Sequence, residues 1–228
     1  MKIINHFWQD LKLLPTAWLL LVQLAILILS VFTIESRTYQ ILSWAMGVLA
    51  LLIIAKVIRN TPTFTMMGLI FVGGAFIFSS LMLFGINNNY LQVIAHAFEA
   101  SAYFCAAYGL IRYMFEDKYL TKDELFAAGA VFTLIAWGFA FLYSICQLLI
   151  PGSFQNPNFA GDYQRWLDLL FLSFSLQSAT GLSDLMPILP AARVIAMIQM
   201  LCGVMYLALI VSRLISLHYV VHKRDSSE

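Results

Sequence analysis

Long apolar runs recur along the whole chain, and they constrain its fold more than any single motif does. Hydrophobic residues make up 61% of the 228 residues, and charged residues make up only 11%. Runs of about 20 apolar residues have the length that a helix needs to cross a hydrocarbon core about 30 Å thick. The sequence therefore predicts an all-α membrane protein with several spanning helices.

Six spanning helices are predicted, with the approximate ranges 15–34, 39–58, 62–86, 90–115, 122–150 and 190–217. Ahead of them, residues 1–14 place apolar and polar side chains on opposite faces at helical spacing, which indicates an amphipathic interfacial helix on the membrane surface. Residues 15–121 are expected to form a four-helix transmembrane domain. Residues 122–217 would form a second domain, and residues 218–228 a cytoplasmic tail.

Basic residues set the predicted orientation, because cytoplasmic segments of membrane proteins hold an excess of Lys and Arg. With six spans, ten of the 13 basic residues fall on the side of both termini and three fall on the opposite side. Both termini are therefore expected in the cytoplasm of a multi-pass cell-membrane protein. The net charge of +1 argues against a nucleic-acid partner, which would need a basic patch to neutralise phosphates.

The stretch between the last two apolar runs has a different pattern. Residues 163–177 are amphipathic but too few to cross a bilayer, and they suit a helix that enters halfway. Non-helical main chain follows, and at membrane depth this is tolerated only where protein buries it or where it lines a water-filled cavity. The C-terminal end of a helix favours a cation, and main-chain oxygens can replace the water around one. The pattern indicates an ion path.

At this stretch the chain resembles the pore module of the potassium-channel superfamily, whose filter motif is Thr-Val-Gly-Tyr-Gly-Asp at the end of a pore helix. Gly181 and Asp184 match the first glycine and the aspartate of that motif, and Gly203 lies where the family has its hinge glycine. The resemblance covers residues 163–217. It implies that residues 122–217 form a pore domain with an outer helix, a pore helix, a filter and an inner helix, assembled as a homotetramer.

Four positions of the filter Ala179-Thr180-Gly181-Leu182-Ser183-Asp184 depart from the family motif. Ala179 lacks the hydroxyl that forms the innermost ion site in the family, and Leu182 lacks the phenol that tethers the filter. A left-handed backbone would cost Ser183 about 1–2 kcal/mol. The extra hydroxyl of Thr180 is expected to bond to the pore helix rather than to contact an ion. These departures imply weaker discrimination in favour of K+.

The resulting hypothesis is a tetrameric channel for K+ or another monovalent cation, with no cofactor, no other metal and no enzymatic activity. Its partners are further copies of the chain and the lipid bilayer. The fourth predicted helix contains only Arg112 as a basic residue, so we do not expect it to sense voltage. The alternative is a non-conducting, channel-like membrane adaptor or regulatory subunit, because four altered filter positions could leave the pore unable to hold ions.

His96 and Glu99 share one face of the fourth predicted helix. An ionisable side chain at membrane depth is costly and is a functional candidate by default. One interpretation is a pH-sensing gate. The other is a structural pair in which His96 or water satisfies Glu99.

Overall fold

The computed structural model describes residues 15–30, 62–83, 88–116, 122–157 and 161–225. These residues are mostly helical, and their helices are α2 (Pro15–Ser30), α4 (Pro62–Leu83), α5 (Asn89–Glu116), α6 (Lys122–Leu149), α7 (Trp166–Gln177) and α8 (Pro190–Asp225). Two short strands, β1 (Phe154–Gln155) and β2 (Met186–Pro187), pair antiparallel. The predicted interfacial helix over residues 1–14 and the predicted span over residues 39–58 lie outside the described residues.

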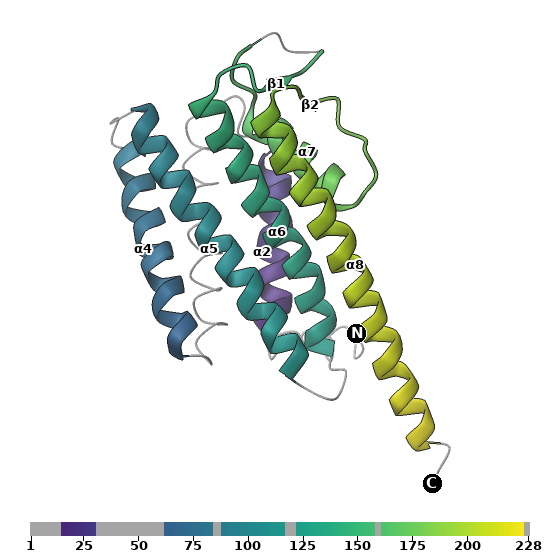
Figure 1. Cartoon of the computed structure of the whole chain (residues 1–228). Coiled ribbons are helices and arrows are strands. Elements are labelled where there is room, and N and C mark those ends of the chain that lie inside the picture. The colour runs from purple at the N-terminus through teal and green to yellow at the C-terminus, as the bar shows by residue number, and fades with distance from the viewer. Residues whose placement is uncertain (1–14, 31–61, 84–87, 117–121, 158–160, 226–228) are drawn as a thin grey trace.

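The helices form a bundle with α5 and α6 at its centre (Figure 1). α4 packs against α5, whereas α2, α7 and α8 pack against α6. α8 extends past the other helices at the end away from the strands (Figure 1), because it continues to Asp225. No Gly or Pro interrupts the chain after Gly203, so residues 218–225 prolong the helix instead of starting a separate tail.

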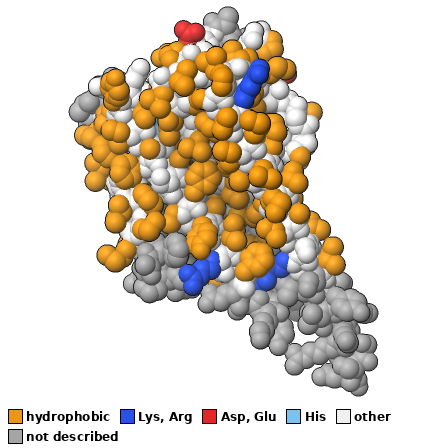
Figure 2. Space-filling view, viewed as in Figure 1, with side chains coloured by type: hydrophobic (Ala, Val, Ile, Leu, Met, Phe, Trp, Pro, Cys, Tyr) orange, Lys and Arg blue, Asp and Glu red, His pale blue; other side chains and the backbone are white. Residues whose placement is uncertain are grey.

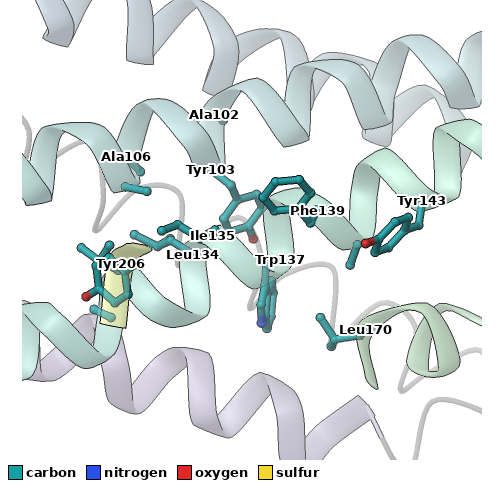
Figure 3. Close-up of a cluster of buried hydrophobic side chains, with 14 of the residues drawn as sticks. Ala102, Tyr103, Ala106, Leu134, Ile135, Trp137, Phe139, Tyr143, Leu170 and Tyr206 are labelled. Carbon is teal, nitrogen blue, oxygen red and sulfur yellow. The ribbon is translucent and has the colours of Figure 1, made fainter. Parts of the chain in front are cut away.

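The core lies where α6 meets its neighbours, and aromatic and small side chains fill it (Figure 3). Its labelled members are Ala102, Tyr103 and Ala106 of α5, Leu134, Ile135, Trp137, Phe139 and Tyr143 of α6, Leu170 of α7 and Tyr206 of α8. Helices surrounded by lipid gain little from the hydrophobic effect, so close packing and interhelical hydrogen bonds must hold them together. The alanines of α5 serve the first of these requirements, because they let α6 approach closely.

Two helices among the described residues are long and apolar enough to cross a membrane. They are Glu124–Leu149 of α6 and Pro190–Arg213 of α8. The most apolar window of α6 is 72% buried inside the bundle, whereas that of α8 is only 28% buried. Figure 2 shows a face covered largely by apolar side chains, with basic side chains near both of its ends. Length and composition thus suggest association with a membrane.

A charged contact fixes α8 to the start of α6. Arg213 Nη2 lies 3.3 Å from Glu124 Oε2, and the Glu124 side chain is only 1% exposed. The Arg213 guanidinium also stacks over the Phe115 ring of α5, 4.8 Å from its centroid. Three helices therefore meet at this end of the bundle.

Gly203 marks the closest approach of α8 to α7. A Cβ at this position would lie 2.5 Å from the main-chain oxygen of Gln177 and 3.0 Å from its Cα. α8 is one continuous helix through Gly203. The close approach is therefore a structural reason for glycine here, and the hinge role of Gly203 stays a prediction.

Gly203→Ala is expected to destabilise the protein by about 1–3 kcal/mol, because the added methyl group overpacks a backbone contact. Gly73→Ala is a matched control in α4, where an added Cβ meets nothing within 4 Å. Alanine favours a helix over glycine by about 1 kcal/mol, so the control variant should be slightly stabilised. Thermal unfolding in detergent, followed by tryptophan fluorescence, checks both. Equal midpoints for the two variants would contradict the close contact.

Candidate functional site

The segment that contains α7 begins and ends at the same end of the bundle. β1 comes before α7 and β2 comes after it, and the pairing of Phe154 with Pro187 brings the two ends of the excursion together. α7 has 12 residues, about 18 Å of helix, which is too short to cross a 30 Å core. Its last residue, Gln177, contacts Gly203 near the middle of the apolar stretch Pro190–Arg213. The helix therefore ends beside the middle of this apolar stretch of α8.

Gln147 of α6 fixes the start of α7. Its Oε1 accepts a hydrogen bond from the Gln164 main-chain N–H at 2.8 Å, and its Nε2 donates to the Gln164 main-chain oxygen at 3.2 Å. Both glutamines are buried. These two hydrogen bonds hold Gln164 outside the helix, so α7 begins at Trp166 and not at residue 163 as predicted. Asp168 in its first turn complements the positive end of the helix dipole.

We call residues 178–184 the α7–α8 loop. Three of its main-chain N–H groups bond to a single residue of α7, Ser175. The Ser175 main-chain oxygen accepts hydrogen bonds from the N–H groups of Thr180 at 3.1 Å and Gly181 at 3.3 Å. The Ser175 hydroxyl accepts a third, from the N–H of Ser183 at 3.2 Å. The Thr180 hydroxyl also lies 3.4 Å from the Ser175 oxygen, which agrees with the expectation that it bonds to the pore helix.

The main-chain oxygens of this loop have a different environment from its N–H groups. Within the described stretches of the chain, no group donates a hydrogen bond to the main-chain oxygens of residues 179–183. Most of this loop is exposed, and the Leu182 side chain is 70% exposed. Main-chain oxygens that accept no hydrogen bond from protein need water or another ligand as a partner. The loop therefore offers a row of acceptors for a ligand outside the single chain.

Backbone strain lies at Ala179 and not at Ser183. Ala179 has a φ of 58° and is the one non-glycine residue with positive φ in the described part of the chain. Gly181, two positions later, has a φ of 65°. A left-handed conformation costs an alanine about 1–2 kcal/mol, and such strain persists only where the surroundings over-determine it. The hydrogen bonds to Ser175 help to provide that determination. Ser183, for which a left-handed backbone would be costly, does not have a positive φ.

A cavity of about 160 Å³ lies behind the loop. Its lining includes Ser183 and Asp184 of the loop together with Arg165, Asp168 and Phe171. One basic and two acidic side chains thus face a small space between the start of α7 and the end of the loop. Among the described residues, no group of three or more His, Cys, Asp or Glu side chains could hold a metal ion.

A buried polar cluster joins α7 to α6 and α8, and the sequence reasoning missed it. Gln199 Nε2 donates to the Ser173 hydroxyl at 2.6 Å and to the Ser173 main-chain oxygen at 3.0 Å, and Gln199 Oε1 accepts from Tyr143 at 2.6 Å. The Ser173 hydroxyl donates to the Ala136 main-chain oxygen at 2.5 Å. A single glutamine in an apolar run gives no periodic signal. Its position inside a predicted membrane helix was the only available clue.

His96 and Glu99 form a close pair. His96 Nδ1 lies 2.9 Å from Glu99 Oε2, and the Ser79 hydroxyl of α4 donates to Glu99 Oε1 at 2.8 Å. Each carboxylate oxygen therefore has a partner, which favours the structural pair over the gate. The pair lies on α5 and is separated from α7 by Phe141, whose ring packs between His96 and Trp166 with centroid distances of 5.5 and 4.4 Å. The structure does not bring it to the α7–α8 loop.

No protein-family model, curated protein or solved structure matches this chain.

Ser175→Ala is expected to loosen the α7–α8 loop, because it removes the hydroxyl that accepts the Ser183 N–H. A hydrogen bond worth about 1 kcal/mol corresponds to roughly fivefold faster amide exchange at Ser183. Ser80→Ala is a matched control, since the Ser80 hydroxyl bonds to the Phe76 main-chain oxygen of its own helix α4. Hydrogen–deuterium exchange read by mass spectrometry measures both. Unchanged exchange at Ser183 in Ser175→Ala would show that the hydroxyl does not hold the loop.

Proposed function

We propose that four copies of this chain surround one axis and pass a monovalent cation, K+ or one of similar size, along the main-chain oxygens of residues 179–183. The observation that carries this proposal is the asymmetry of the α7–α8 loop. Three of its N–H groups are bound by Ser175, whereas the main-chain oxygens of residues 179–183 accept no hydrogen bond from the described residues. Rings of main-chain oxygens are what a dehydrated monovalent cation uses in place of water.

Several copies are needed because one chain contributes one loop, and the oxygens of one loop cannot surround an ion. The surface of α8 supports assembly. Its buried side chains form one narrow stripe at three- and four-residue spacing, made of Ala192, Ala196, Gln199, Gly203, Tyr206 and Ile210. Large apolar side chains cover much of the remaining surface, such as Met197, Leu201 and Met205, which are 52–65% exposed. Such a surface suits contact with lipid and with neighbouring copies.

The proposed membrane arrangement is six spans with both termini in the cytoplasm and the α7–α8 loop near the outer half of the bilayer. α2, α4 and α5 would belong to the four-helix domain, and α6 and α8 would be the outer and inner helices of the pore. α5 carries Arg112 as its one basic residue, so this domain would not sense voltage. The resemblance of residues 163–217 to the potassium-channel pore agrees with the half-inserted helix and its following loop.

Discrimination between cations is proposed to be weaker than in that family. Ala179 brings no hydroxyl to the innermost position, and it holds a strained backbone. The Leu182 side chain is largely exposed and forms no polar tether. Discrimination depends on how firmly the oxygens are held at the distance that suits one ion, so a less tethered loop distinguishes K+ from Na+ less well.

A non-conducting adaptor or regulatory subunit is the second candidate function, and the exposure of Leu182 favours it. Four such side chains around a narrow axis could fill it and leave no room for an ion. Ordered ion density on the axis of an assembled particle would support the channel, and leucine side chains meeting there would support the adaptor.

Cation flux into liposomes tests the proposal. The wild-type protein is expected to pass K+ and, less well, Na+, and the particle should have four times the 25.7 kDa mass of one chain by native mass spectrometry. Gly181→Ala should reduce flux roughly tenfold, because the left-handed backbone at this position costs an alanine about 1–2 kcal/mol and each 1.4 kcal/mol is a factor of ten.

Gly152→Ala is the matched control for this experiment. Gly152 also has a positive φ, at 75°, and an added Cβ there also meets nothing within 4 Å, but it lies in the turn after α6. It carries the same backbone strain away from the loop and should keep wild-type flux. Equal loss in both variants would point to general destabilisation, and absence of any wild-type flux would overturn the channel.

A further inference from the structure

Gln199 is the centre of a chain of hydrogen bonds that starts and ends on α6. Its amide nitrogen bonds to Ser173 of α7, and its amide oxygen accepts from Tyr143 of α6. Ser173 in turn donates to the Ala136 main-chain oxygen, which also belongs to α6. The side chains of Tyr143, Ser173 and Gln199 all have 0% exposure. These hydrogen bonds therefore link three helices at a fully buried site.

A cluster of this kind is not needed merely to fill space. An apolar side chain of similar size would avoid the cost of removing an amide from water, and buried polar groups are tolerated only when their hydrogen bonds are satisfied. Polar side chains inside membrane helices serve instead to fix how one helix sits on another. The cluster is consequently best explained by the geometry that it imposes on α7 and α8.

Two contacts one helical turn apart define that geometry. Gln199 and Gly203 are four residues apart on α8, and they meet Ser173 and Gln177, which are four residues apart on α7. The Gln199 amide also lies 3.4 Å from Gln177 Oε1. One contact is a set of directed hydrogen bonds and the other is a backbone contact with no room for a methyl group. Together they prevent α8 from sliding or rotating against the last turn of α7.

The last turn of α7 also holds the loop. Ser175 lies between Ser173 and Gln177, and it binds the N–H groups of Thr180, Gly181 and Ser183. A displacement of α8 that keeps the Gln199 hydrogen bonds must therefore move the residue from which the loop hangs. The path has three steps: from α8 to Ser173, along two residues of α7 to Ser175, and from Ser175 to the loop.

We propose that Gln199 is a positioning residue that fixes the last turn of α7 and passes displacements of α8 to the α7–α8 loop. In a channel, this coupling makes the oxygens of the loop respond to the position of the inner helix. The inference rests on the proposed cation conduction, but the positional role of Gln199 is measurable without it.

The chain offers a matched control in Gln23. Gln23 of α2 is likewise 0% exposed, and its Oε1 accepts a hydrogen bond of 2.6 Å from Thr133 of α6. Gln23→Leu and Gln199→Leu are therefore the same substitution at equally buried sites with one strong hydrogen bond to α6. Of the two glutamines, only Gln199 bonds to α7. Gln23 Nε2 is buried without a hydrogen-bond partner among the described residues, whereas Gln199 Nε2 bonds to α7. A difference between the variants in exchange at the α7–α8 loop therefore reports the contact with α7.

The first readout is amide exchange in the full-length protein in detergent. Gln199→Leu is expected to speed exchange at Thr180, Gly181 and Ser183 roughly fivefold, the change that follows from losing one hydrogen bond. Tyr143→Phe removes a single O–H and should act in the same direction with a smaller change. Gln23→Leu should leave exchange at these three amides unchanged.

The second readout is the K+ to Na+ permeability ratio, taken from reversal potentials of single channels under bi-ionic conditions. Gln199→Leu is expected to change the ratio at least roughly threefold, while Gln23→Leu stays within about twofold of the wild type. If Gln199→Leu gives no folded protein, Tyr143→Phe provides the same comparison. A fold-stabilising role alone would alter unfolding midpoints in both glutamine variants and would leave the permeability ratio unmoved.

The outcomes separate the two proposals. Wild-type exchange at the loop in Gln199→Leu, or equal acceleration in Gln23→Leu, overturns the positional role of Gln199. A conducting wild type with an unchanged permeability ratio in Gln199→Leu and Tyr143→Phe overturns the coupling and leaves the channel intact. A wild type that passes no cation overturns the proposed function, whatever the exchange rates are.

Discussion

The need to give main-chain polar groups a hydrogen-bond partner governs the structure around α7. A helix satisfies most of its own groups, and this holds for α6 and α8, which are long and apolar enough to cross a membrane. The α7–α8 loop does not satisfy its own main-chain groups. The other described residues provide partners for N–H groups of the loop but not for the main-chain oxygens of residues 179–183. Ser175 takes three N–H groups with two oxygen atoms, at its main chain and at its hydroxyl. The main-chain oxygens of residues 179–183 remain available to a ligand outside the described residues. The proposed function assigns that ligand as a monovalent cation.

A helix as short as α7, with 12 residues, also has to be held in place by its neighbours. α7 is held at three heights along its length. Gln147 binds the main chain just before its start, Ser173 is bonded to both α6 and α8 in its middle, and Gly203 admits its end against α8. These hydrogen bonds and the close contact at Gly203 prevent rotation and sliding that apolar packing alone would allow. They therefore also determine where the α7–α8 loop lies.

The sequence predicts the described helices well, because apolar length and the breaks at Pro62, Pro190 and residues 150–165 carry strong local signals. It also predicts a short helix between the last two apolar runs, and α7 is that helix. It does not predict the contacts that depend on three dimensions. Strain falls on Ala179 because Ser175 takes particular N–H groups, and no sequence pattern tells which. Gln199 looks like one polar residue in an apolar run, and the pairing of β1 with β2 involves too few residues to show a period.

The bare oxygens of the loop have a consequence for biosynthesis. In the proposed tetramer, a newly inserted single chain would present residues 179–183 to lipid or to a few water molecules, and either environment would be costly for it. Association of the copies and hydration of their shared axis would then relieve the same penalty in one step. The pool of solitary subunits should consequently be small and short-lived in the cell, and quality-control proteases would meet mainly those chains that failed to find companions.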